Sequence, residues 1–240
     1  MYYGVGLIIL LVVVYAVWVS FFNTPPTCSD GKQDGTELGV DCGGSCALLC
    51  QDTAHDPTVL WARPFQTGAN TYTAAAYIQN NNLGAGAKSV QYSFQLFDDT
   101  NSLVKEIDGT TDLPPVPVVP IIAPNISVGN RTVTHVQFAF AAAPAWYKIP
   151  AKSLPTLFVS QQNLAGDGSR LSATISNQTL FDAKNVTVAA VLFDSQGVAR
   201  AASKSLVQVI PAQSASQVVF TWPIGTPDIV RAEITVLPSF

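Results

Sequence analysis

Two stretches of the chain decide its fold: AKSVQYSFQLFDD at 87–99 and AKNVTVAAVLFDS at 183–195. Both begin Ala-Lys-x-Val and carry Leu-Phe-Asp near the end, and the second copy follows the first at an offset of 96 residues. In the first copy apolar and polar residues alternate, which is typical of a strand with one buried and one solvated face. The chain therefore contains an internal repeat, and the repeated unit is a β-domain.

The alternation assigns the faces of each central strand. In the first copy Gln91, Ser93 and Gln95 are expected on the solvated face. The residues expected in the two cores are Val90, Tyr92, Phe94 and Leu96 in the first copy, and Val186, Val188, Ala190 and Leu192 in the second. Asn81 and Asn177 share the offset of the repeat. Asp98 and Asp194 follow the strands and favour a hairpin turn.

Short Thr-, Val-, Gln- and Ser-rich segments surround both copies, without a long helical period, and indicate an all-β sandwich. Each copy has about the length of an immunoglobulin-like domain. We therefore predict two tandem immunoglobulin-like β-sandwich domains, at 56–145 and 146–240. The Pro-rich segment 113–120 is predicted as an edge strand or extended loop. Further strands are expected at Leu103–Ile107, Thr132–Phe140, Leu157–Gln161, Leu171–Ser176, Val198–Lys204, Ser216–Trp222 and Ile229–Leu237.

The N-terminal segment Tyr2–Phe22 has no charged side chain and is predicted to be a helix. A helix of that length spans roughly 30 Å, the thickness of a bilayer core. No basic residue precedes it, so a membrane anchor at 1–23 is favoured over a cleaved signal peptide. This interpretation makes membrane lipid a partner of residues 2–22. It places the bulk of the chain outside the cytoplasm, in a protein that crosses the cell membrane once.

All four cysteines, Cys28, Cys42, Cys46 and Cys50, lie in the juxtamembrane loop predicted at 24–55. An even number of cysteines in so short a segment indicates two disulfides. Of the three pairings, Cys28–Cys42 with Cys46–Cys50 is our expectation, because Gly43 and Gly44 permit a turn between the two bridges. The spacing does not fit a zinc site.

The same loop carries Asp30, Asp34, Glu37 and Asp41 with glycines between them. Carboxylate oxygens on a flexible backbone are the ligands that calcium prefers, although the spacing is not that of an EF-hand. Two interpretations stay open, a calcium site formed by these four acids and a solvated acidic loop. No other cofactor is expected.

Two motifs resemble known modules. The segment Phe94-Gln95-Leu96-Phe97-Asp98 resembles the FxLYD domain, an immunoglobulin-like module, with Phe97 where that domain has Tyr. The cysteine pattern, with its Asp-Cys-Gly-Gly at 41–44, is similar to a short module of bacterial surface proteins. The whole plan resembles uncharacterised single-pass surface proteins of candidate-phylum bacteria. This resemblance implies a surface location and a fold, and no activity.

Composition limits the function further. Only 12% of the residues are charged and the net charge is −4, so nucleic acid is not an expected partner. His55 and His135 lack the companions of a catalytic triad, and no catalytic residue is assigned. The sequence favours a non-enzymatic protein that binds a partner, an envelope or cell-surface protein or glycan, or builds envelope structure. The alternative is a pilin-like filament subunit that self-associates through its N-terminal helix.

Replacing Leu10 and Leu11 with Arg tests the predicted anchor. Each charge at the centre of a membrane helix costs about 2.5–3.5 kcal/mol on insertion scales, so membrane retention should be lost. Sedimentation of the variant with washed membranes is the measurement. Unchanged sedimentation would show that residues 2–22 are not what holds the protein there.

Overall fold

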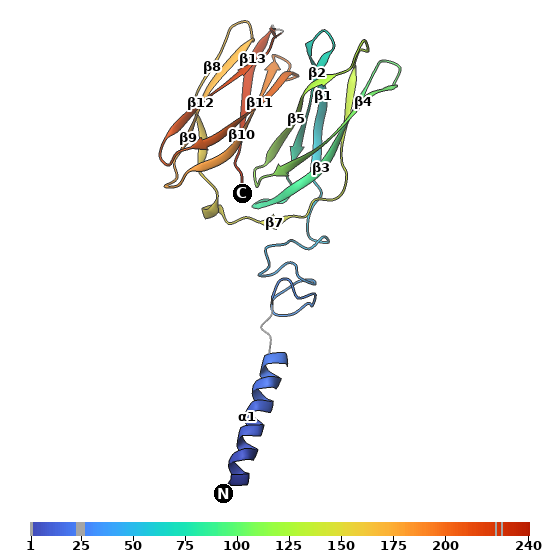
Figure 1. The fold of residues 1–240 in the computed structure, drawn as a ribbon. Coiled ribbons are helices and arrows are strands. Elements are labelled where there is room, and N and C mark those ends of the chain that lie inside the picture. Colours follow the sequence, from blue (N-terminus) through green and yellow to red (C-terminus); the bar gives the residue numbers. More distant parts are fainter. Residues whose placement is uncertain (1, 23–26, 224, 227) are drawn as a thin grey trace. The chain divides into compact units, whose positions relative to one another are not determined.

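The computed structural model describes residues 2–22, 27–223, 225–226 and 228–240, and it divides the chain into compact units at 1–50 and 51–240 (Figure 1). In the first unit, helix α1 spans Tyr2–Phe22, the bounds predicted from the sequence. Among the described residues, however, no helix is both long enough and apolar enough to cross a membrane. The membrane anchor at 1–23 stays a prediction from the sequence.

The first sandwich is built from residues 58–148. One sheet has the strand order β1-β2-β5, and the other has the order β4-β3-β6, with the short strand β7 also paired to β3. All of these pairs are antiparallel. The strands are β1 (Thr58–Gly68), β2 (Thr71–Gln79), β3 (Ala85–Phe97), β4 (Leu103–Leu113), β5 (Val118–Ser127), β6 (His135–Phe140) and β7 (Tyr147–Lys148).

The second sandwich repeats this topology. After a short 3₁₀ turn at Ala151–Ser153, one sheet has the order β12-β9-β8 and the other the order β11-β10-β13. Strands β8 to β13 thus correspond in order and pairing to β1 to β6, which is the internal repeat in three dimensions. The strands are β8 (Leu157–Leu164), β9 (Arg170–Asn177), β10 (Ala183–Asp194), β11 (Ala199–Ile210), β12 (Ala215–Thr221) and β13 (Ile229–Leu237).

The predicted core faces are confirmed. Every residue expected to point inward on β3 and β10 is buried, and Phe94, Leu96 and Leu192 are fully so. Gln91 is exposed on the opposite face of β3. On the same face, the Ser93 hydroxyl and the Gln95 amide both donate to the Glu106 carboxylate. The outer face of sheet β4-β3-β6 is therefore polar.

The sequence pattern missed strands β1, β2 and β5. Strand β2 reads TYTAAAYIQ and is buried on both faces from Tyr72 to Ile78, so it shows no alternation. Strands β1 and β5 contain prolines, which weaken a strand prediction. Pro120 lies in β5, at the edge of its sheet, while Pro114 to Pro117 form a loop, as expected for the Pro-rich segment.

One detail of the repeat needs correction. The residue equivalent to Asn177 is Asn80 and not Asn81. The Asn80 amide donates to the carbonyl oxygens of Ala85 and Pro114, and the Asn177 amide donates to those of Phe181 and Ile210. Both asparagines are buried, where an amide needs such partners. The asparagine lies seven positions before Ala87 in the first copy and six before Ala183 in the second, which shifts the offset there.

An apolar cluster joins the two sandwiches. The outer face of sheet β1-β2-β5 packs on the outer face of β10 and β11. At its centre Tyr77 lies between Trp61, which it stacks on at 4.5 Å, and Phe193, whose ring it meets edge-on at 6.4 Å. The buried residues of this junction cluster are Phe65, Ala75, Tyr77, Ile122, Ala189, Val191, Phe193, Ala199 and Ala202.

Two substitutions on β10 test the junction cluster. Leu192→Ala opens a cavity in the second core and should cost about 2–5 kcal/mol of unfolding free energy. Because the cluster couples the sandwiches, we expect calorimetry to show a single transition at lower temperature. Val191→Lys places a charge in the cluster and should separate the melting of the two sandwiches into two transitions.

Gln95→Ala is the matched control, since its face is polar, and should change stability by less than about 0.5 kcal/mol. Two independent transitions in the unaltered protein would contradict the coupling.

Candidate functional site

A cavity of about 630 Å³ lies where the two sandwiches meet, and we call it the junction cavity. One wall is a continuous run of β1, residues 61–66. Residues 132–135, which lead into β6, form a second wall, and residues 198–200 of the second sandwich form a third. The cavity shares Trp61, Phe65 and Ala199 with the junction cluster, so it exists only while the sandwiches are packed together.

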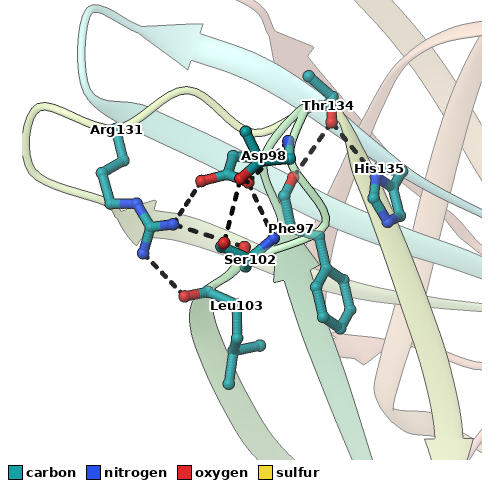
Figure 2. A network of polar contacts seen from close by, with 8 residues as sticks. Phe97, Asp98, Ser102, Leu103, Arg131, Thr134 and His135 are labelled. Carbon is teal, nitrogen blue, oxygen red and sulfur yellow. Dashed lines mark hydrogen bonds and ion pairs between the residues drawn. The ribbon is translucent and has the colours of Figure 1, made fainter.

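The hairpin after β3 fixes the wall at residues 132–135 (Figure 2). Asp98 accepts hydrogen bonds from the backbone N–H groups of Thr100 and Ser102 and pairs with the Arg131 guanidinium. Arg131 also donates to the carbonyl oxygen of Leu103. The Arg131 guanidinium and the Thr100 hydroxyl hold the pKa of the Asp98 carboxyl well below its usual range. One charged side chain therefore ties the hairpin to the segment that enters the cavity wall.

His135 is placed by the same hairpin. The backbone N–H of Thr134 donates to the carbonyl oxygen of Phe97 at 2.9 Å, and the Phe97 ring stacks on the His135 imidazole at 5.1 Å (Figure 2). The Thr134 hydroxyl lies 3.2 Å from His135 Nδ1. His135 is half-buried and lines the cavity. His135 is thus a positioned side chain of the junction, a place that no pattern in its neighbourhood predicts.

The second Leu-Phe-Asp copy fixes the opposite wall. Asp194 accepts hydrogen bonds from the backbone N–H groups of Gln196 and Val198, as Asp98 does from the matching residues. Its cation is Arg200, which donates through Nε at 2.7 Å and lines the cavity. The Val198 N–H is the main cause that lowers the pKa of the Asp194 carboxyl, with Arg200 adding to it. Both motif copies therefore border one site.

A second hollow of about 670 Å³ is also lined by both sandwiches. Its walls include the prolines Pro114, Pro120 and Pro124 of the first sandwich and Leu206 and Leu237 of the second. Lys204 lines it, and partial burial lowers the pKa of its ammonium group.

The cysteines form two disulfides, with a pairing that differs from the expected one. Cys28 is joined to Cys46, and Cys42 is joined to Cys50. Gly43 and Gly44 do make a turn, and both have positive φ. That turn brings Cys42 opposite Cys50, because the Gly43 N–H donates to the Leu48 carbonyl. A side chain at Gly44 would collide with the backbone of Thr36, so Gly is required there.

Three of the four acids of this loop, Asp30, Glu37 and Asp41, accept hydrogen bonds from its backbone, whereas Asp34 Oδ1 is buried without a partner among the described residues. Asp41 accepts from the N–H groups of Asp30 and Gly31, and Asp30 accepts from the N–H of Lys32. Glu37 accepts from the N–H groups of Asp34 and Asp41. These bonds explain why carboxylates alternate with glycines in a loop that has no regular ladder. The calcium site stays a prediction from the sequence.

Across the described part of the chain, one group of metal-ligating side chains has its ligand atoms within 4.8 Å of one another, namely Cys28, Glu37 and Cys46. Its two sulfurs are joined in a disulfide and are not thiolates, so the group does not fit a zinc site as it stands. Asp30, Asp34 and Asp41 do not belong to it, and neither do His55 and His135. His55 is exposed, and its backbone exchanges two hydrogen bonds with the Asn82 side chain.

Comparison with known proteins leaves the family open. No protein-family model matches the chain, and no curated protein matches it. Among solved structures, one match is the N-terminal tandem of two CBM22 domains from Paenibacillus barcinonensis, at 8% identity over 78% of this chain and 92% of that chain. Its TM-score is 0.19, and so weak a superposition carries no argument about fold or ligand.

The two hairpin carboxylates predict a pH dependence of stability. Their pKa values are lowered in the folded state, so their stabilisation is complete above the unfolded pKa of about 4 and is lost as the pH falls through the folded pKa. Asp194→Asn keeps an acceptor oxygen for the turn but removes the charge beside Arg200. We expect a lower melting temperature at pH 7, and a difference from the unaltered protein that shrinks below about pH 4.

Asp98→Asn should behave in the same way. Asp99→Asn, at an exposed position of the same hairpin, is the control and should leave the pH profile unchanged. A difference that does not shrink at all as the pH falls from 7 to 2 would mean that turn geometry, and not charge, is what the carboxylates contribute.

Proposed function

We propose that this is a non-enzymatic binding protein that works outside the cytoplasm and holds its partner at the junction of its two β-sandwiches. The observation that carries the proposal is the junction cavity, because both repeats contribute to its walls and both Leu-Phe-Asp hairpins fix those walls. Its volume lies in the range of small-molecule sites, roughly 300–1,000 Å³. Two packed sandwiches thus provide a surface that neither would have alone.

The location rests on the two disulfides, which persist in oxidising compartments. Attachment to the membrane through residues 2–22 is the part of the proposal that rests on the sequence alone. The same holds for membership of the FxLYD-like surface proteins. Alkylation of protein taken from the native envelope should find no free thiol among the four cysteines, and four reactive thiols would overturn the proposed location.

The alternative of a filament subunit has less support from the β-domains. The contact between the sandwiches joins two different faces, and such a contact repeated between copies would build an open fibre. The faces left at the two ends are polar, however. Gln91, Ser93 and Gln95 lie on one of them, and half-buried Ser172 and Thr174 lie on the other. Phe158 and Val219 are exposed on the second face as well, but they do not form an apolar cluster like the one at the junction.

Binding of the purified full chain to isolated envelope material tests the proposal. The unaltered protein should be retained, and Val191→Lys should lose retention because it separates the sandwiches that form the cavity. Gln95→Ala, on the polar outer face, should be retained like the unaltered protein. Equal retention of all three proteins, or retention of none, would contradict a partner site at the junction.

A further inference from the structure

The junction cavity is basic, although the protein as a whole is acidic. The chain has a net charge of −4 with only 12 lysines and arginines. Two of these arginines, Arg63 and Arg200, line the cavity together with His135. Among the described residues of the lining there is no Asp or Glu. Asp194 pairs with Arg200 from outside the lining, so the uncompensated charge of the cavity comes from Arg63, and it favours an anionic ligand.

The two guanidinium groups have hydrogen-bonding capacity to spare. Arg200 uses Nε for Asp194, and no bond from its two η nitrogens to the described residues is found. Arg63 is exposed, and its guanidinium makes no hydrogen bond or ion pair with the described part of the chain. A guanidinium presents its donors as a planar fork that matches a carboxylate. The cavity therefore presents guanidinium donors from both sandwiches, which one anionic group can accept.

The rest of the lining fits a hydroxylated ring. Trp61 and Phe65 supply apolar aromatic wall, and Trp61 is held by its stacking on Tyr77. Neutral side chains that both donate and accept hydrogen bonds stand beside them, namely Gln66, Thr132 and Thr134. Aromatic surface suits the apolar face of a ring, and amides and hydroxyls suit its hydroxyl groups.

We propose that the junction cavity binds an acidic sugar, a ring that carries hydroxyl groups and one carboxylate, such as a uronic acid unit of a glycan. Arg63 and Arg200 hold the carboxylate, and Trp61 packs against the ring. The inference rests on the proposed binding function and specifies its ligand. Since Arg63 belongs to the first sandwich and Arg200 to the second, the ligand bridges them and stabilises their packing.

The test uses the purified full chain and trigalacturonic acid as the probe, followed by calorimetric titration and thermal denaturation. The fully methyl-esterified trimer is the matched ligand control, because it keeps the rings and removes the charges. We expect the acid to bind and to raise the melting temperature, with the ester at least about tenfold weaker, the loss of one charge-assisted contact. Binding should also weaken as salt is raised.

Arg63→Gln is the diagnostic variant, because Arg63 is exposed and its replacement should leave the fold intact. It should lower the affinity for the acid about tenfold, and Arg200→Gln should do so as well. Arg170→Gln removes an exposed arginine outside the cavity and should bind normally. Normal binding by Arg63→Gln would place the sugar elsewhere and overturn the assignment.

The remaining outcomes are also decisive. Equal binding of acid and ester would overturn recognition of the carboxylate. An equal rise in melting temperature with inorganic phosphate alone would overturn recognition of the ring. If neither trimer binds but the envelope material retains the unaltered protein and not Val191→Lys, the proposed ligand is wrong and the proposed binding function is supported. If envelope retention fails as well, both are wrong.

Discussion

Strand β10 is apolar on both faces. Val188, Ala190 and Leu192 point into the second core, while Ala189, Val191 and Phe193 point away from it and are equally buried. Exposing that second face to water would cost roughly 25 cal/mol for every Å² of apolar area. The first sandwich covers it, and Arg231 covers the Phe193 ring at 4.2 Å. The packing of the sandwiches and the cavity beside it both follow from this strand.

Much of the fold could be predicted because the repeat marks its own core. The alternation along 90–96 assigned the faces of β3, and the matching segment located β10 and its hairpin. The junction cluster was also visible in principle. The positions that are Gln91, Ser93 and Gln95 in the first copy are Thr187, Ala189 and Val191 in the second. When the outward-facing residues of a strand change from polar to apolar between two copies, the apolar face is expected to be covered by another part of the protein.

The candidate site was harder to foresee, because it is assembled from segments far apart in sequence. Trp61 and Arg63 lie in strand β1, whose proline weakens a strand prediction from the sequence. His135 and Arg200 lie in predicted strands, but nothing in the sequence places them at one site. The disulfide pairing was wrong for a related reason. Two glycines indicate a turn, but which cysteines face each other across it depends on hydrogen bonds such as the one from Gly43 to Leu48. Local residue types do not fix those contacts.

The cysteine loop makes the protein sensitive to reduction. Among its described residues, 27–55, the buried ones are Gly43, Cys46 and Cys50, so the two disulfides take the place of a hydrophobic core. A segment of this kind has no fold to return to once its bridges are reduced, and its peptide bonds then become accessible to proteases. Cleavage near Lys32 would therefore record whether a given molecule has ever been in a reducing compartment.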